Sequence, residues 1–196
     1  MPKIRIIILT QNFPPSIGGI QTVMYNLAFG LSDFFNITVI APAQLGSREW
    51  DLKQSFNIIR YNRIKFLRTY FITSLLNGLS DNDNFFIITD TWKSNEYIIS
   101  YLENKSYKLI TIAHGNDVLD KGSIKKRIRI NNSLSHCYKI IAVSNFTAQL
   151  LKKLSLENVK VIPNGINPFQ AINPDIGNNI TNEGPILLTI SRIEPR

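Results

Sequence analysis

The sequence predicts an α/β fold, a Rossmann-like doubly wound parallel sheet, from two observations. Short β-branched runs alternate with longer stretches of helical composition, which is typical of a sheet whose strands are joined by helical crossovers. Most of the short runs are apolar at every position, as expected for strands buried on both faces. Apolar residues make up 44% of the 196-residue chain, which is enough for a hydrophobic core and excludes general disorder.

The strands and helices are expected in alternation. Strands are expected at Ile4–Leu9, Asn36–Ile40, Asn57–Tyr61, Phe85–Thr89, Lys108–Ala113, Lys139–Val143 and Lys160–Ile162. Helices are expected at Gly19–Ser32, Ile64–Leu79, Lys93–Asn104, Ile124–Ser135 and Asn145–Leu154. Ser144 precedes the last of these helices, and its hydroxyl is suited to cap the free amides of the first turn.

The composition changes near the C-terminus and predicts a domain boundary there. Residues 164–184 contain two prolines, several glycines and many asparagines, with little periodic apolar signal, which is typical of a linker. A new strand-like run begins at Pro185. We therefore expect an N-terminal domain at 1–170, a linker at 171–184, and the first strand of a truncated second domain at 185–196.

Several classes of protein are excluded by composition. The single cysteine, Cys137, rules out an intramolecular disulfide framework and a cysteine-cluster zinc site. With only His114 and His136, a histidine-based metal site is improbable. The apolar runs are of strand length, too short to span a bilayer, and the N-terminus has no signal-peptide pattern. A cytoplasmic location is expected.

The net charge of +8 is concentrated in two blocks and points to an anionic partner. No acid lies between Asp51 and Asp81, or between Asp120 and Glu157. The partner could be nucleic acid, a membrane surface or a phosphorylated substrate, and a solvated basic face is the alternative. The bases in these blocks are Lys53, Arg60, Arg63, Lys65, Arg68, Lys121, Lys125, Lys126, Arg127, Arg129, Lys139, Lys152 and Lys153.

Residues 60–71 mix bases with aromatic residues, which suits an anionic bilayer or RNA. No RNA-binding signature accompanies the segment, so an anionic membrane is the expected partner and nucleic acid is not. The alternative is a helix that packs one face into the core; that face would carry Ile64, Leu67, Phe71 and Leu75.

Ligands of a doubly wound sheet bind at the carboxyl ends of the strands, where the first candidate is the loop at 10–21. Pro14 and Pro15 stiffen this loop, and Gly18-Gly19 let the backbone approach a ligand with no Cβ in the way. The helix that follows offers free amides to a phosphate or carboxylate. The loop is not a Gly-x-Gly-x-x-Gly fingerprint, and we expect it to contact a ligand.

Further candidates follow other strands. His114 ends a core strand, where it can exchange a hydrogen bond near neutral pH, and Asp117 either holds its imidazole or caps the next turn. Trp92, near the carboxyl end of another strand, either stacks on a ligand or packs over the next helix. Ser144 and Asn164 occupy equivalent strand ends, and Asn164-Gly165 alone would be read as a turn.

One acidic pattern is interpreted as structural. Asp81-Asn82-Asp83 matches a metal-binding Asp-x-Asp motif, but it follows Gly78-Leu79-Ser80 and precedes a strand. The simplest interpretation is a loop that ends a helix. No metal ligands and no cofactor are expected.

Together, these motifs resemble family 4 glycosyltransferases, which are retaining enzymes of GT-B architecture with two Rossmann-like domains. The resemblance runs from Ile4 to Arg196. It rests on Phe13-Pro14-Pro15 with Gly18-Gly19, His114-Gly115-x-Asp117, Ala142-Val143-Ser144, Pro163-Asn164-Gly165 and the tail at 188–196, in that order. Asn167 departs from the family, which commonly has aspartate there.

The resemblance implies roles for individual residues. Gly18 and Gly19 would meet the donor diphosphate and the acceptor, His114 would contact the donor sugar near the reacting carbon, and Arg192 would bind the nucleotide diphosphate. It also implies that the chain is the N-terminal, acceptor-binding half of a GT-B enzyme. The ligand on which Trp92 could stack would then be an acceptor sugar. In the family's proposed front-face route the leaving phosphate helps to deprotonate the acceptor hydroxyl, so no carboxylate pair is needed in this half.

The expected function is hexosyltransferase-type transfer of a sugar, with retention, from a nucleotide-sugar donor to a glycan or lipid-linked acceptor in polysaccharide biosynthesis. Peripheral association with the inner face of the membrane is expected, and residues 1–196 are expected to be inactive alone. Two alternatives stay open. One is a non-catalytic acceptor- or anion-binding module, and the other is a sugar-nucleotide epimerase of the same fold, against which the Gly18-Gly19 and His114-Gly115 pairs argue.

Overall fold

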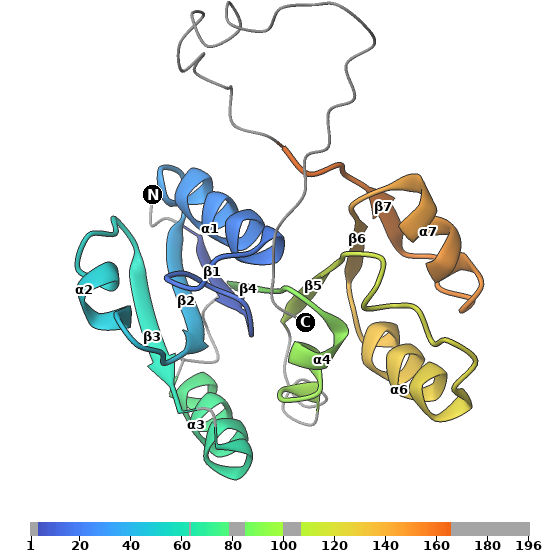
Figure 1. The fold of residues 1–196 in the computed structure, drawn as a ribbon, viewed down its shortest axis with the longest axis horizontal. Helices are drawn as coiled ribbons and strands as arrows, with labels where there is room; N and C mark the ends of the chain where they lie inside the picture. Colours follow the sequence, from blue (N-terminus) through green and yellow to red (C-terminus); the bar gives the residue numbers. More distant parts are fainter. Residues whose placement is uncertain (1–3, 63, 79–84, 100–106, 166–196) are drawn as a thin grey trace, which may run out of the picture. The chain divides into compact units, whose positions relative to one another are not determined.

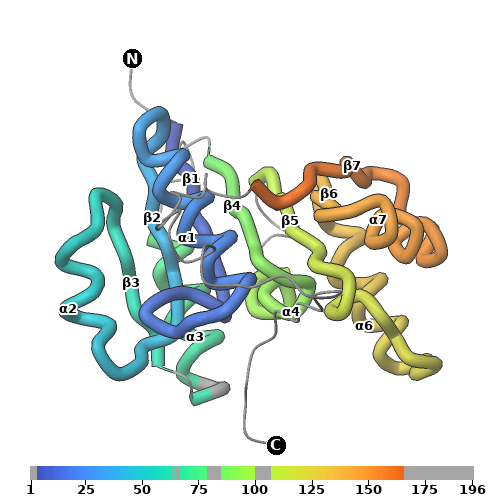
Figure 2. The backbone as a smooth tube through the Cα atoms, turned by 45° about the horizontal axis from the view of Figure 1, so that its top comes forward, coloured from blue at the N-terminus to red at the C-terminus, as the bar shows by residue number. Residues whose placement is uncertain are grey.

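A seven-stranded parallel sheet is the centre of the computed structural model, which describes residues 4–62, 64–78, 85–99 and 107–165. The strand order is β3-β2-β1-β4-β5-β6-β7, and Figure 2 shows it from one edge of the sheet to the other. Every pairing is parallel. The strands are β1 (Arg5–Leu9), β2 (Asn36–Pro42), β3 (Asn57–Tyr61), β4 (Phe85–Thr89), β5 (Lys108–Ala113), β6 (Lys139–Ala142) and β7 (Val159–Val161).

Helices cover both faces of the sheet (Figure 1). They are α1 (Gly19–Ser32), α2 (Ser47–Asp51), α3 (Lys65–Asn77), α4 (Trp92–Asn95), α6 (Ile124–Ser135) and α7 (Asn145–Lys152). Alternate residues of β1 enter two separate hydrophobic clusters. Ile7 packs in the cluster shared by α3, α4, α6 and α7, and Ile8 packs in the cluster beside α1 and α2. The sheet is therefore doubly wound, as predicted.

The predicted elements agree closely with the observed ones. All seven strands are found within two residues of their expected bounds, and α1 and α6 match theirs at both ends. The short helix α2 was not predicted. The helix expected at Lys93–Asn104 begins one residue earlier, at Trp92, and α4 ends at Asn95; residues 100–106 lie outside the described ranges. The predicted linker, the second-domain strand, Arg192 and Asp81-Asn82-Asp83 also lie outside them.

The alternative interpretation of residues 60–71, a helix that packs Ile64, Leu67, Phe71 and Leu75 into the core, is correct only at Leu75, which is partly buried against the core. Ile72 and Leu76 are the side chains that α3 buries against the sheet, whereas Ile64, Leu67 and Phe71 are exposed. The helix is apolar on two sides, so its sequence allowed either side to face the core.

Among the described residues, no helix combines the length and the apolarity that crossing a membrane requires.

Candidate functional site at the carboxyl edge of the sheet

The carboxyl ends of the parallel strands meet at one edge of the sheet, where the buried carboxylate of Asp90 joins two loops. Asp90 follows β4 and is fully buried. Its Oδ2 accepts hydrogen bonds from Thr10 Oγ1 at 2.8 Å, Gln11 N at 3.0 Å and Asn12 Nδ2 at 2.9 Å. Its Oδ1 accepts one from Ser94 Oγ at 2.6 Å. Asp90 thus fixes the start of the loop that carries Gly18 and Gly19.

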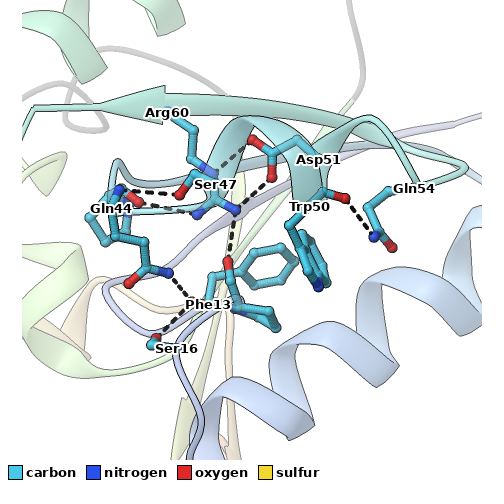
Figure 3. A network of polar contacts seen from close by, with 10 residues as sticks. Phe13, Ser16, Gln44, Ser47, Trp50, Asp51, Gln54 and Arg60 are labelled. Atoms are coloured by element: carbon cyan, nitrogen blue, oxygen red, sulfur yellow. Dashed lines mark hydrogen bonds and ion pairs between the residues drawn. The ribbon is translucent and has the colours of Figure 1, made fainter.

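Arg60, at the end of β3, is a second anchor for this loop (Figure 3). Its Nε and Nη2 donate to the carboxylate of Asp51 at 3.0 and 2.6 Å. The guanidinium also donates to the carbonyl oxygens of Pro14, at 2.7 Å, and Pro42, at 3.1 Å. An arginine fork can serve several acceptors in fixed directions, so one side chain links the ends of β2 and β3 to the proline pair.

The loop after β2 lies against the same segment. Gln44 Nε2 donates to the Phe13 carbonyl at 2.8 Å, and Ser16 Oγ donates to the same oxygen at 2.9 Å (Figure 3). Phe13 itself is buried against Trp50. The approach to the glycine pair, which follows β1, is therefore held from the ends of three other strands, β2, β3 and β4.

Gly18 and Gly19 stand where a ligand could approach the backbone. Gly18, the N-cap of α1, has an extended conformation with φ at 167° and ψ at 164°, which any residue can adopt, and as a glycine it offers no side-chain cap to the helix. Gly19 begins α1, is exposed, and a Cβ built on it would meet nothing within 4 Å. The described residues thus supply no packing reason for glycine at position 19.

His114 lies after β5 with one ring nitrogen buried and unpartnered. Among the residues that the structure describes, Nε2 of His114, Oδ2 of Asp117 and Oγ1 of Thr91 are buried without a hydrogen-bond partner. Burial lowers the pKa of His114, opposed by the nearby charges of Asp117 and Asp90, so the neutral imidazole is favoured. A neutral imidazole can donate or accept a hydrogen bond from this position.

Asp117 caps the turn after β5, which was one of the two roles expected for it; the other was to hold the imidazole of His114. Its Oδ1 accepts hydrogen bonds from the main-chain N–H of His114 and of Val118, each at 3.0 Å. Burial raises the pKa of Asp117, while His114 and these main-chain donors act in the opposite direction. The adjacent Gly115 has φ at +92°, a left-handed conformation that favours glycine.

The expectation that Trp92 stacks on an acceptor sugar is corrected by its position. Trp92 is 1% exposed, and its Nε1 donates to the Asp117 carbonyl at 2.9 Å. Its own carbonyl accepts a hydrogen bond from Ser133 Oγ at 2.5 Å. Because Trp92 follows the buried strand β4 and is covered by α6, its indole ring has no exposed face on which a sugar could stack.

The remaining candidates differ in what surrounds them. Ser144 is the N-cap of α7, as predicted, and its Oγ accepts from Thr147 N at 3.1 Å. Asn164 is exposed beyond β7. The strand order therefore brings Gly18, Gly19, His114, Asp117 and Ser144 to one edge of the sheet. Sequence reasoning missed Asp90 as an anchor, although an acid directly after a buried strand was a usable signal.

Several bases of the charged blocks are engaged within the protein. Arg60 has the contacts described above. On α6, Lys126 donates to the Leu119 carbonyl, Arg127 donates to the Lys153 carbonyl at 3.0 Å, and Arg129 forms an ion pair of 2.7 Å with Glu96. These blocks are thus less free to meet an external anion than the sequence suggested.

Comparison with known proteins agrees with this architecture. Residues 17–169 match the family described as Glycosyltransferase Family 4. No curated protein matches the chain.

Solved structures share the fold at low sequence identity. Sucrose-phosphate synthase (tll1590) from Thermosynechococcus elongatus is 14% identical, with a TM-score of 0.67 over 84% of this chain and 49% of that one. Anabaena Alr3699/HepE in complex with UDP is 17% identical, with a TM-score of 0.63 over 84% and 45%. UDP-N-acetylglucosamine 2-epimerase from Rickettsia bellii is weaker, at 10% identity and a TM-score of 0.58 over 81% and 44%.

The chain spans about half the length of these structures, and its Rossmann-like sheet corresponds to one half of a GT-B glycosyltransferase, as predicted. The family match covers most of the chain, including α1, His114 and the cap of α7. The chain belongs to glycosyltransferase family 4.

Proposed function

We propose that the protein transfers a hexosyl group, with retention, from a nucleotide-sugar donor to a glycan or lipid-linked acceptor. This chain supplies the acceptor-side half of the site, and residues 1–170 form that domain. The observation that supports the proposal most directly is the unpartnered Nε2 of His114, at the same sheet edge as the open backbone of Gly19, in a family 4 chain.

In this proposal the donor meets His114 and the start of α1. The HepE structures were solved with UDP and with UDP-glucose, which supports a nucleotide-sugar as the donor class here. Negative charge builds on the leaving diphosphate as the glycosidic bond breaks. The first turn of α1 has no side-chain cap, and its amides would stabilise that charge. We propose that no metal ion is required for this step.

His114 would act on the sugar rather than on the phosphate. A neutral imidazole held by its own loop can hydrogen-bond a sugar hydroxyl as positive charge develops on the reacting carbon. Asp117 accepts hydrogen bonds from the main-chain N–H of His114 and of Val118, so it positions His114 without touching the substrate. Ser144 and Asn164 remain proposed binding residues at the neighbouring strand ends.

Exposed aliphatic side chains in and beside the loop at 10–21 suit an acceptor that has an apolar part. Ile17 is 86% exposed, and Leu45, in the adjoining loop, is fully exposed. Exposed aliphatic side chains beside a polar site favour a ligand that carries both characters, such as a lipid-linked glycan. We accordingly propose that the protein acts in polysaccharide biosynthesis at the cytoplasmic face of a membrane.

The test is an assay of the full-length protein against a panel of sugar nucleotides, with free and lipid-linked acceptors, with and without a chelator. Product stereochemistry is read by NMR. Transfer with retention, undiminished by the chelator, is expected. Release of an epimerised sugar with no transfer would indicate the epimerase. Acceptor binding with no turnover on any donor would indicate a non-catalytic module.

A further inference from the structure

A cavity of about 600 Å³ lies between helix α2 and β3, the strand at one edge of the described sheet (Figure 1). Its lining runs from Ala43 and Gln44, which follow β2 at the carboxyl edge, to Asn57, the first residue of β3. None of the candidate site residues lines it. The cavity is therefore a second place on this domain where a ligand could bind.

The charges in the lining leave one cation free. Of the described residues that line the cavity, three are charged: Arg48, Asp51 and Arg60. Asp51 and Arg60 form a largely buried ion pair of 2.6 Å (Figure 3). Arg48 is exposed, and its guanidinium forms neither an ion pair nor a hydrogen bond with another described residue. Glu49, on the same helix, is not part of the lining. The cavity thus offers one guanidinium to an anionic group of a ligand.

Apolar side chains form much of the remaining wall. Leu52 is 81% exposed, Ile58 is half-buried, and Phe56 is buried against the core on its other side. The exposed Asn57 adds an amide. Pockets for organic ligands are typically apolar with a few placed polar groups. A pyranose ring presents C–H groups on its faces and hydroxyls at its rim, so it suits a lining of this composition.

We propose that this cavity binds an anionic sugar unit of the acceptor, a pyranose ring that carries a carboxylate or a phosphate group. The guanidinium of Arg48 would bind the anionic group, and Leu52 and Ile58 would contact the ring. This inference rests on the proposed function and deepens it by naming the class of acceptor, which is an acidic glycan.

Two hydrogen bonds connect the cavity to the loop at 10–21. Gln44 Nε2 donates to the Phe13 carbonyl at 2.8 Å, and Arg60 Nη2 donates to the Pro14 carbonyl at 2.7 Å (Figure 3). Both donors belong to residues that line the cavity. A glycan bound in the cavity can therefore continue along this loop toward the glycine pair.

The cavity is remote from His114. Four strand spacings separate β3 from β5 in the order β3-β2-β1-β4-β5, which is about 19 Å at the usual distance between neighbouring strands. The sugar in the cavity would thus be several units from the reacting hydroxyl. We expect binding at this distance to stabilise the ground state and the transition state equally, so that it lowers KM and leaves kcat unchanged.

An extended peptide is the rival occupant, because β3 is an edge strand with which a peptide could pair. Such pairing depends on main-chain hydrogen bonds. It gives no role to the free guanidinium of Arg48 or to the apolar wall beside it. The composition of the cavity therefore favours the acidic sugar.

The experiment is an NMR titration of the full-length protein prepared with isotope-labelled arginine. The Nε–H signal of Arg48 is assigned by its loss in Arg48→Lys. Methyl glucuronoside, which tests the carboxylate, and glucose 6-phosphate, which tests the phosphate, should each shift this signal, and less at high salt. Methyl glucoside lacks the charge and inorganic phosphate lacks the ring, so each should bind about fivefold more weakly than the acidic sugars.

Variants locate the binding site through the signals of the ligand. Arg48→Ala should weaken the binding of methyl glucuronoside about fivefold, because the paired cation is lost. Leu52→Ser should weaken it about threefold by removing apolar contact. Both residues are exposed, so the melting temperature should not change. Lys152→Ala removes an exposed base from the cavity beside α7 and should bind as wild type. In transfer to an acidic acceptor, Arg48→Ala should raise KM about fivefold with kcat unchanged.

The proposal would be overturned if methyl glucoside or inorganic phosphate shifted the Arg48 signal as strongly as the acidic sugars, or if no probe shifted it. Equal weakening by Lys152→Ala would have the same meaning. A larger shift with an acetylated valine–glutamate–valine peptide would assign the cavity to a peptide instead. Binding of acidic sugars without turnover on any donor would count against the transferase and leave the sugar site standing.

Discussion

The indole Nε1 of Trp92 donates a 2.9 Å hydrogen bond to the main-chain carbonyl of Asp117. This bond joins the segment after β4 to the loop after β5, and the carboxylate of Asp117 in turn holds the main-chain N–H of His114. The position of the His114 backbone therefore depends on a buried side chain from the segment that follows a neighbouring strand.

Replacing His114 by alanine in the full-length protein should lower kcat about 10²-fold or more, a typical loss for one well-placed polar group at the reacting centre. The melting temperature should change little, because the ring's buried Nε2 has no partner to lose among the described residues. His136→Ala, at an exposed position, is the control for both measurements. A lowered melting temperature with normal kcat would make His114 structural.

The lowered pKa of His114 should also appear in the pH dependence of stability. As pH falls below 6.5, the unfolded chain binds a proton at this residue that the folded chain resists, so the free energy of unfolding should decrease. Full stability from this group is present above pH 6.5. Urea titrations of wild type and His114→Gln across this pH range should show a shallower decrease in the variant. If the free energy of unfolding depended on pH in the same way in wild type and His114→Gln, the lowered pKa of His114 would be refuted.

Removing the Asp90 carboxylate should destabilise the fold strongly. Asp90→Ala leaves four donors without their acceptor, and a cost of about 2–4 kcal/mol in the free energy of unfolding is expected. Urea denaturation measures it, and Glu157→Ala, at an exposed acid, should cost less than about 0.5 kcal/mol. Equal stability of the two variants would mean that Asp90 is not an anchor.

Two glycines should respond to alanine in opposite ways. Gly19→Ala should be neutral or stabilising by about 0.5 kcal/mol, since the position is helical and open, yet it should weaken donor or acceptor binding. Gly115→Ala should cost about 1–2 kcal/mol, because its φ is +92° and the new Cβ would lie 3.2 Å from Thr147 Oγ1. Thermal unfolding measures the change in stability of each variant, and isothermal titration calorimetry measures the change in its affinity for the substrate. Unchanged substrate affinity in Gly19→Ala would remove this glycine from the site.

Much of the fold was predictable because its signals are local. The strands are continuous β-branched runs, and α1 and α6 have helical composition between clear strand ends. Helix α2 was missed because five residues give too little periodicity, and it begins after Gly46 in a left-handed conformation. The alternative interpretation of α3 chose the wrong side for three of its four residues, because either side of the helix was apolar enough to pack.

The residues of the candidate site were predictable where their place in the fold follows from their position at the end of a strand. His114 and Gly18-Gly19 follow core strands, so topology alone places them at the carboxyl edge. Asp90 and Arg60 take their roles from partners up to 80 residues away, which no local pattern reports. Trp92 was assigned the right strand end, but whether its ring faces solvent depends on how α6 packs over it.

The bonds from Asp90 to Thr10, Gln11 and Asn12 cross between β1 and β4, adjacent strands whose chains leave the sheet for opposite faces. Such a topological switch point is where a crevice opens in a doubly wound sheet. Here the starts of the two loops are preorganised, because the hydrogen bonds of Asp90 order the first residues of both in the folded protein. A substrate entering there would spend little of its binding free energy on ordering those loops, so more of it is left to discriminate between sugars.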